Sequence, residues 1–274
     1  MRPLNKASQV LRATVTDPVE LGLKIIDVVA ERREQRVMPS DLYFPEERWE
    51  ARLHALLGSP WPCSAVEDFW QLWPRVMSLL EARGLQVGRG AFGGWGDGEP
   101  GMTRAIWCSV IHSKPRRVIE TGVARGVTSR FILEALERNG SGSLLSIDLP
   151  PQLKAELHDQ IGAAVPPECR GRWTYVRGSS RRRLPRVLAQ LKSTDLFVHD
   201  SRHTERNVRF ELDRVWEALD PGGILVVDDI DVSHGFHSFV DDHPGIESIV
   251  CEAEPLRSDP GRYNGRGLFG IIRK

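Results

Sequence analysis

The sequence has few cysteines and no closely spaced pair of them. Four occur in 274 residues, and no two stand in the C-x-x-C spacing that is typical of zinc-binding and redox motifs. The spacing predicts neither a zinc site nor a disulfide framework, and it favours free thiols in a reducing compartment. The four positions are Cys63, Cys108, Cys169 and Cys251.

The chain also lacks an excess of charge and a long apolar run. Lysine and arginine total 37, as do aspartate and glutamate, and this balance argues against nucleic acid or another polyanion as the main partner. No apolar run approaches the roughly 18 residues of a membrane span. Residues 1–18 lack the apolar stretch of a signal peptide. We therefore expect a cytoplasmic protein without a membrane anchor.

The first hundred residues combine helical patterns with a glycine-rich segment. Apolar residues recur at helical spacing around 21–29, from about 46 to 57, and from 65 to 83. Residues 84–101 contain eight glycines, so this segment is either a plain linker or a mobile lid. We expect residues 1–101 to form an N-terminal helical cap that ends in this glycine-rich segment.

From residue 116 onward, short apolar runs alternate with amphipathic stretches. This alternation is typical of a parallel sheet covered by helices on both faces. The sequence therefore predicts an α/β domain over residues 102–274, with a Rossmann-like, seven-stranded, mostly parallel sheet. The expected strands are 117–120, 144–148, 173–177, 195–199, 224–228, 248–252 and 268–273. The expected helices are 128–138, 153–165, 181–191 and 204–219.

A glycine-bearing turn follows the first predicted strand. Glu120 ends the strand, and Gly122 and Gly126 form a G-x-x-x-G turn that leads into a helix. Such glycines let the backbone approach a ligand at the carboxyl edge of the sheet. A dinucleotide site is the alternative, but it requires G-x-G-x-x-G, and Ala124 stands at the second glycine position. Glu120 would repel a pyrophosphate, whereas it suits a cofactor that carries an ammonium and a sulfonium.

The next two predicted strands end in residues suited to a nucleoside. Asp148 closes the second strand, where its carboxylate can accept hydrogen bonds from both hydroxyls of a ribose. Ser179 and Ser180 follow the third strand, and these small polar residues suit the rim of an adenine pocket. An aspartate at a strand end is often only a helix cap. The prediction therefore depends on the order of these features along the chain.

Three aspartates follow the fourth and fifth predicted strands. Asp200 ends one strand, and Asp228 and Asp229 end the next. Clustered carboxylates repel each other, and a bound divalent cation relieves this repulsion. Because all the ligand atoms would be oxygens, Mg²⁺ is the favoured cation. His203 is the candidate general base, because a neutral imidazole accepts a proton near pH 7. The alternative is that these residues only cap helices or face solvent.

Residues 116–274 resemble the class I S-adenosylmethionine-dependent methyltransferases, in particular the metal-dependent small-molecule O-methyltransferases of the catechol, macrocin and mycinamicin type. The macrolide-sugar enzymes among them carry a histidine at the spacing of His203. The resemblance implies ribose binding by Asp148 and an adenine contact by Ser179 or Ser180. It also implies that the methionine part of the cofactor is lined by Glu120, Gly122, Ala124, Gly126 and Thr128.

The resemblance implies Mg²⁺-assisted methylation of a hydroxyl on a small, diol-like acceptor, such as a natural-product sugar or a phenol. Two alternatives stay open: a cephalosporin-hydroxylase-like enzyme of the same fold, and a non-catalytic cofactor-binding protein. Five arginines between residues 177 and 186 could bind RNA or an anionic substrate, but we interpret them as a solvated helix face. Homo-oligomerisation is also left open.

Overall fold

The computed structural model describes residues 18–20, 22–23, 26, 29, 42–88, 90–97, 99–152, 154–252 and 267–274. Most of the predicted helix around residues 21–29 lies outside the described residues, including its apolar positions Leu21, Ile25 and Val28. Within the described ranges, no helix combines the length and the apolar character needed to cross a membrane.

A seven-stranded sheet forms the centre of the structure, with the strand order β3-β2-β1-β4-β5-β7-β6. Strands β1 to β5 run parallel, and β7 runs antiparallel to both of its neighbours. The predicted seven-stranded, mostly parallel sheet is therefore confirmed. The strands are β1 (Arg117–Thr121), β2 (Ser143–Asp148), β3 (Trp173–Arg177), β4 (Thr194–His199), β5 (Leu219–Val227), β6 (Glu247–Glu252) and β7 (Leu268–Arg273).

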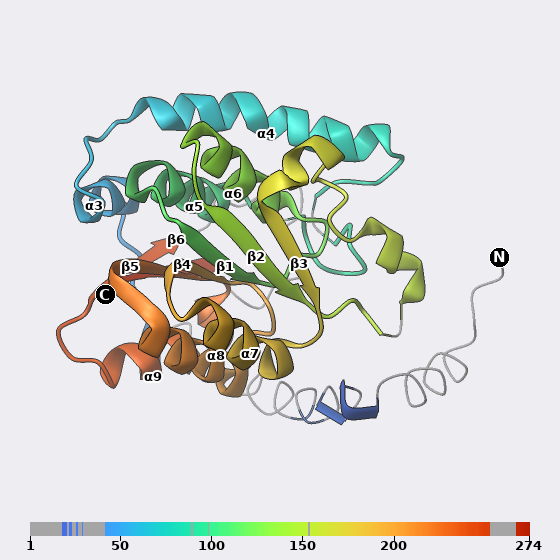
Figure 1. Cartoon of the computed structure of the whole chain (residues 1–274). Coiled ribbons are helices and arrows are strands. Elements are labelled where there is room, and N and C mark those ends of the chain that lie inside the picture. Colours follow the sequence, from blue (N-terminus) through green and yellow to red (C-terminus); the bar gives the residue numbers. More distant parts are fainter. Residues whose placement is uncertain are drawn as a thin grey trace.

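Helices cover both faces of the sheet, and α3 (Trp49–Leu56) lies beside β6 (Figure 1). In β4, Leu196 and Val198 belong to the core on one face, whereas Phe197 belongs to the core on the other. A strand buried on both faces is apolar throughout, which explains the apolar runs in the sequence. One face carries α4 (Ser64–Ala82), α5 (Pro100–Ser113) and α6 (Val127–Arg138). The other carries α7 (Ser180–Leu191), α8 (Glu205–Ala218) and α9 (Gly235–Asp241).

The N-terminal helices share the core of the sheet. Phe69 of α4, Trp107 of α5 and Phe131 of α6 are fully buried. The ring centroids of Phe69 and Phe131 are 4.7 Å apart, and those of Trp107 and Phe131 are 6.1 Å apart. Such aromatic pairs add about 0.5–1.5 kcal/mol beyond the burial of their area. Trp107 also donates its indole N–H to the carbonyl of Ala65 at 2.8 Å, so α4 and α5 are fixed to each other.

Two predicted features differ from the structure. The α-helix expected at residues 153–165 is wrong: this stretch contains the 3-10 helix η2 (Ala155–Gln160), and η3 (Pro167–Arg172) follows. Gly162, at φ 68°, and Pro166 interrupt a continuous helix here. The sequence also did not predict α5 and α9. Residues 100–110 of α5 are all buried, so this helix has no polar face and no amphipathic period that could reveal it.

The turn after β1 passes very close to the end of β4. Gly122 has a φ of 87°, and a Cβ atom at this position would lie 1.8 Å from the carbonyl oxygen of Asp200. Only glycine fits here, because the neighbouring group is backbone and the conformation is left-handed. This contact brings the glycine turn and Asp200 together at one edge of the sheet.

Replacing Gly122 with alanine should push the two strand ends apart. Overpacking costs about 1–3 kcal/mol, and the left-handed conformation adds about 1–2 kcal/mol, so we expect the free energy of unfolding in urea to fall by about 3 kcal/mol. The matched control is Gly58→Ala, which has a φ of 64° but no atom within 4 Å of the added Cβ. Equal losses in the two variants would contradict the steric argument.

Candidate functional site

Acidic residues gather at the carboxyl edge of the sheet. The strand ends stand in register there: Thr121 of β1 pairs with Ile147 of β2 and with His199 of β4, and His199 pairs with Val227 of β5. The loops that follow these strands therefore meet at one edge. The predicted site residues at this edge are Glu120, Asp148, Asp200, Asp228 and Asp229.

Glu120 lies inside the protein and is 1% exposed. Its Oε2 accepts hydrogen bonds from the hydroxyls of Ser129 and Ser146, each at 2.6 Å. Its Oε1 is buried and has no hydrogen-bond partner among the described residues. Burial raises the pKa of Glu120 to about 7, and the charge of Asp148 adds to the rise, although both serine bonds oppose it. Thr128, next to Ser129 in the first turn of α6, is buried as well.

Asp148 holds the glycine turn. Its carboxylate accepts the backbone N–H groups of Val123, within the turn, and of Leu149. Burial raises the pKa of Asp148 to about 6, although these two bonds lower it.

Two residues of the glycine turn have a left-handed backbone conformation. Ala124 has a φ of 46°, and Gly126, which precedes α6, has a φ of 78°. A left-handed residue other than glycine is strained, and such residues cluster at functional sites.

The two serines after β3 have different surroundings. The hydroxyl of Ser180 hydrogen-bonds to Glu211 of α8. Ser179 is the N-cap residue of α7, and its Oγ is buried without a hydrogen-bond partner in the described parts of the chain. Its backbone N–H donates to Glu20 at 3.1 Å. Of the two predicted adenine contacts, Ser179 therefore has the hydroxyl that no other side chain engages.

Asp200, Asp228 and His203 form a compact group, in which the donor atoms lie within 4.8 Å of one another. Asp229 lies at its edge: its Oδ2 is 3.7 Å from Nε2 of His203, and Oδ1 of Asp200 is 4.0 Å from the same nitrogen. Asp229 has a φ of 48°, a second strained, left-handed residue at this edge. The structure thus brings the predicted metal ligands and the predicted base together. His203 lies in the loop before α8.

The electrostatics of this acidic cluster favour a bound cation. Burial raises the pKa of Asp200 and of Asp228 well above the ordinary value, and the charge of Asp229 adds to both shifts. Burial and the charge of Asp231 raise the pKa of Asp229 to about 6. A divalent cation would stabilise the ionised carboxylates, and a set of carboxylate oxygens fits Mg²⁺ or Mn²⁺. Burial, together with His199, lowers the pKa of His203 to about 3, so its imidazole is neutral near pH 7.

A buried network that was not predicted lies beneath the cluster. Glu211 is fully buried, and its carboxylate is bonded by Nδ1 of His199 at 2.7 Å and by the hydroxyls of Thr121 at 2.6 Å and Ser201 at 2.7 Å. Burial opposes ionisation, but the charge of His199 and these bonds outweigh it and lower the pKa of Glu211 to about 2. The ring of His199 meets that of His203 edge-on, with centroids 5.4 Å apart. The signal in the sequence was a glutamate on the apolar side of the helix predicted at 204–219.

Residues 119–230 match a family model that is described as a methyltransferase domain. The match begins in β1, which precedes the glycine turn, and extends past the acidic pair that follows β5. This segment is a class I methyltransferase domain. The predicted resemblance to class I S-adenosylmethionine-dependent methyltransferases, and the enzyme class of methyltransferase, are therefore confirmed. No protein with a curated description matches the chain.

Solved structures share the fold of this methyltransferase domain. An O-methyltransferase from Bacillus cereus, solved in complex with SAH, has 14% sequence identity and a TM-score of 0.51, and the match covers 89% of this chain and 100% of that one. The O-methyltransferase TomG from Streptomyces achromogenes has 16% identity and a TM-score of 0.47, over 84% of this chain and 99% of that one. At these identities, the likeness to the Bacillus cereus enzyme shows the fold alone.

The glycine-rich segment that precedes the methyltransferase domain is fastened to the glycine turn. Arg125, within the turn, pairs with Asp97 at 3.1 Å and donates to the carbonyl of Ala91 at 2.9 Å. It also bonds the side chain of Gln160 in η2 at 3.0 Å. Arg125 and Asp97 are both buried. The segment is therefore packed against the glycine turn in this structure.

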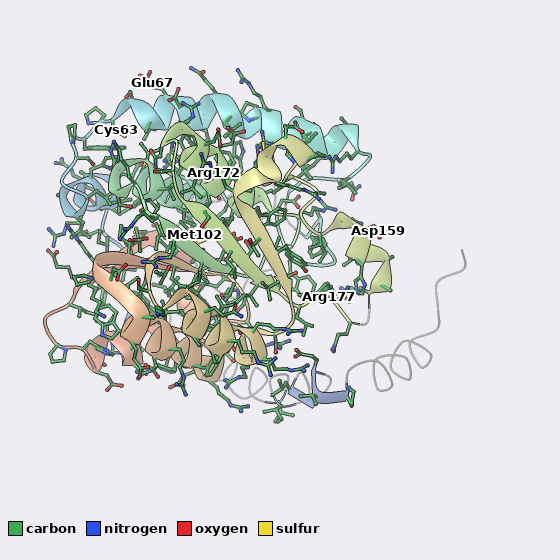
Figure 2. The ribbon with its side chains drawn as sticks, viewed as in Figure 1. Cys63, Glu67, Met102, Asp159, Arg172 and Arg177 are labelled. Atoms are coloured by element: carbon green, nitrogen blue, oxygen red, sulfur yellow. The ribbon has the colours of Figure 1, made fainter. Side chains whose placement is uncertain are left out.

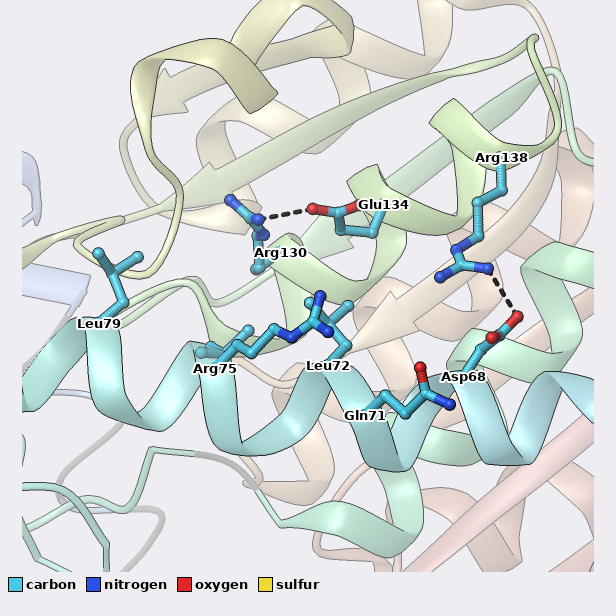
Figure 3. A pocket seen from close by; sticks show the side chains of 9 residues that line it. Asp68, Gln71, Leu72, Arg75, Leu79, Arg130, Glu134 and Arg138 are labelled. Carbon is cyan, nitrogen blue, oxygen red and sulfur yellow. Dashed lines mark hydrogen bonds and ion pairs between the residues drawn. The ribbon is translucent and has the colours of Figure 1, made fainter.

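Of two cavities in the described part of the chain, one lies away from the predicted site residues and the other lies next to one of them. One of about 190 Å³ lies between α4 and α6, where ion pairs join Arg130 to Glu134 and Arg138 to Asp68 (Figure 3). None of the predicted site residues lines it. The other, of about 240 Å³, is lined by residues that include Arg177, which pairs in register with Asp148. This second cavity therefore adjoins Asp148, the residue that is predicted to bind the ribose. Its lining residues are Pro150, His158, Ile161, Arg170, Trp173, Tyr175 and Arg177.

The raised pKa of Glu120 predicts a pH dependence of stability. The folded pKa of about 7 lies above the ordinary glutamate value of 4.5, so the folded state binds the proton more tightly than the unfolded chain. Stability from this group is fully present below pH 4.5 and is lost as pH rises towards about 7. Over this window, we expect Glu120→Gln to flatten the fall in the unfolding free energy by up to about 3 kcal/mol. Urea unfolding at several pH values measures this difference, and parallel curves would contradict it.

Proposed function

We propose that this chain transfers the methyl group of S-adenosylmethionine to a hydroxyl of a small hydroxylated acceptor, such as a natural-product sugar or a phenol, with the help of Mg²⁺, in the cytoplasm. One observation carries the proposal: three aspartates and His203 gather beside the glycine turn, and the backbone of Asp200 touches Gly122. A methyl donor at the turn and an acceptor at the acidic cluster would therefore be neighbours.

The cofactor roles follow from the free acceptors at this edge. Oε1 of Glu120 can accept a hydrogen bond from the ammonium group of the cofactor, and the turn from Gly122 to Gly126 would line the methionine part. Asp148 is proposed to bind the ribose, and Ser179 to contact the adenine. The Bacillus cereus structure, which is in complex with SAH, supports this choice of cofactor.

The acidic cluster is proposed to hold Mg²⁺ through Asp200, Asp228 and Asp229. When bound, the ion would lower the pKa of an acceptor hydroxyl and fix its orientation. His203 would then take the hydroxyl proton at Nε2, because its imidazole is neutral and lies beside both Asp200 and Asp229. Glu211 would hold His199 against the ring of His203 and so restrict the orientation of this base.

The N-terminal cap, residues 1–101, is proposed to shape the acceptor pocket. Three of its residues reach the carboxyl edge of the sheet. The hydroxyl of Tyr43 donates to the carbonyl of Ser233 at 3.4 Å in the loop after β5. Glu99 is the N-cap residue of α5. Its carboxylate raises the pKa of Asp228, although burial and the charges of Asp229 and Asp200 contribute more to this rise. Glu20 pairs with Arg182 at 3.3 Å in the first turn of α7.

Calorimetric titration with S-adenosylhomocysteine, with and without Mg²⁺, tests the cofactor. We expect binding in both conditions, and we expect a methylated product from catechol or a sugar diol only when S-adenosylmethionine and the metal are both present. Product formation in excess chelator would rule out the metal role. Absence of binding would overturn the proposal and would favour an enzyme of this fold that needs another co-substrate, such as a cephalosporin-hydroxylase-like protein.

Two variants should separate the metal ligands from the base. Asp228→Asn removes a ligand charge, so we expect the apparent Mg²⁺ affinity to fall at least about 10-fold. His203→Gln should keep that affinity and lower kcat about 100- to 10,000-fold. The matched control is Asp159→Asn, an exposed aspartate of η2, which should leave both parameters unchanged. An equal loss of metal affinity in His203→Gln would make His203 a metal ligand instead of the base.

A further inference from the structure

A second cluster of ligand-type side chains lies among the N-terminal helices. His54 of α3, Cys63 just before α4 and His112 in the last turn of α5 have donor atoms within 4.8 Å of one another. Nε2 of His54 is 3.0 Å from Sγ of Cys63, and Nε2 of His112 is 3.5 Å from the same sulfur. Three separate elements thus direct two imidazoles at one thiol.

A hydrogen bond from the second ring nitrogen fixes the orientation of His54. Its Nδ1 bonds the backbone carbonyl of Glu50 at 2.7 Å, so Nδ1 carries the proton and Nε2 presents its lone pair to Cys63. Histidine ligands of metals commonly donate their second ring nitrogen to a carbonyl in this way. The ring of His112 meets that of His54 edge-on, with centroids 5.2 Å apart.

A fourth ligand-type residue stands beside the three. Cys108 is buried in α5, one helical turn before His112, and it interacts with Cys63, although its sulfur is not among the donor atoms that lie within 4.8 Å of one another. Two cysteines and two histidines are the donor set of many structural zinc sites. In tetrahedral zinc with the usual bond lengths, nitrogen and sulfur ligands are about 3.6 Å apart. The separation at His112 fits this value, and that at His54 is shorter by about half an ångström.

We propose that His54, Cys63 and His112 hold a structural zinc ion, and that Cys108 completes the ligand set when the ion is bound. The site would join the ends of three helices: α3, which lies beside β6, the start of α4, and the end of α5, which packs on α6. His54 is buried, whereas Cys63 and His112 are half-buried, so a metal ion can reach the cluster from solvent. Soft sulfur and imidazole ligands select zinc over the magnesium that suits carboxylates.

The zinc cluster is separate from the methyl-transfer edge. Figure 2 shows Cys63 near the start of α4 and Arg177 at the carboxyl end of β3, on opposite sides of the molecule. The proposal therefore does not depend on the proposed function. Asp228→Asn should therefore leave the zinc content unchanged.

Metal analysis of the purified full chain, together with cobalt substitution, tests the proposal. We expect a single zinc ion per chain, and a thiolate-to-cobalt charge-transfer band when Co²⁺ replaces it. Cys63→Ser should lose the band and weaken zinc binding more than about 100-fold, beyond the effect typical of an outer-shell partner. The matched control is Cys169→Ser, another half-buried free cysteine, which should keep both.

Each outcome decides the proposal. Wild-type protein without stoichiometric zinc after purification and after zinc titration would overturn it, as would a folded Cys63→Ser variant with unchanged zinc affinity. If Cys63→Ser fails to fold, the cobalt spectrum of the wild-type chain decides, because a thiolate band requires a cysteine ligand. A chelator should also lower the Tm of the wild-type chain, and zinc should restore it.

Discussion

The contact between the Cα of Gly122 and the backbone carbonyl of Asp200 is the constraint on which the rest of the candidate site depends. It joins the turn after β1 to the loop after β4, at the point where the strand order of the sheet reverses. Strand register alone would bring these loops to the same edge, but not into van der Waals contact. Because the turn holds no side chain there, one loop can present a cofactor surface while the adjoining loop presents carboxylates.

The same edge contains acidic residues with opposite electrostatic behaviour. Glu211 is ionised because His199 and several hydroxyls surround it, and its pKa falls to about 2. Asp200 and Asp228 have chiefly each other and Asp229 as charged neighbours, and burial together with this repulsion raises their pKa values. A carboxylate with its partners in place needs nothing more, so Glu211 supports the site, whereas the aspartates are suited to take up a cation.

The sequence predicted the sheet and the strand-end acids well, for a physical reason. Buried parallel strands are apolar runs, and their carboxyl ends must share an edge, so topology alone places Asp148 near Asp200. Pairings between distant segments could not be predicted in this way. Arg125 and Asp97 are 28 residues apart, and Cys63 and His112 are 49 apart. Such pairs depend on how helices pack, and α5, which is buried from residue 100 to residue 110 and fixes much of that packing, has no amphipathic pattern.

Helix α5 connects the two sites of different chemistry. Its N-cap residue, Glu99, acts on the pKa of Asp228 at the sheet edge, and its last turn carries His112 beside Cys63. A helix of 14 residues spans about 21 Å, and its backbone hydrogen bonds join one end to the other. A metal ion that fixed the far end of α5 would therefore also fix the position of Glu99. The zinc cluster would in this way support the geometry of the acidic cluster without contact between them.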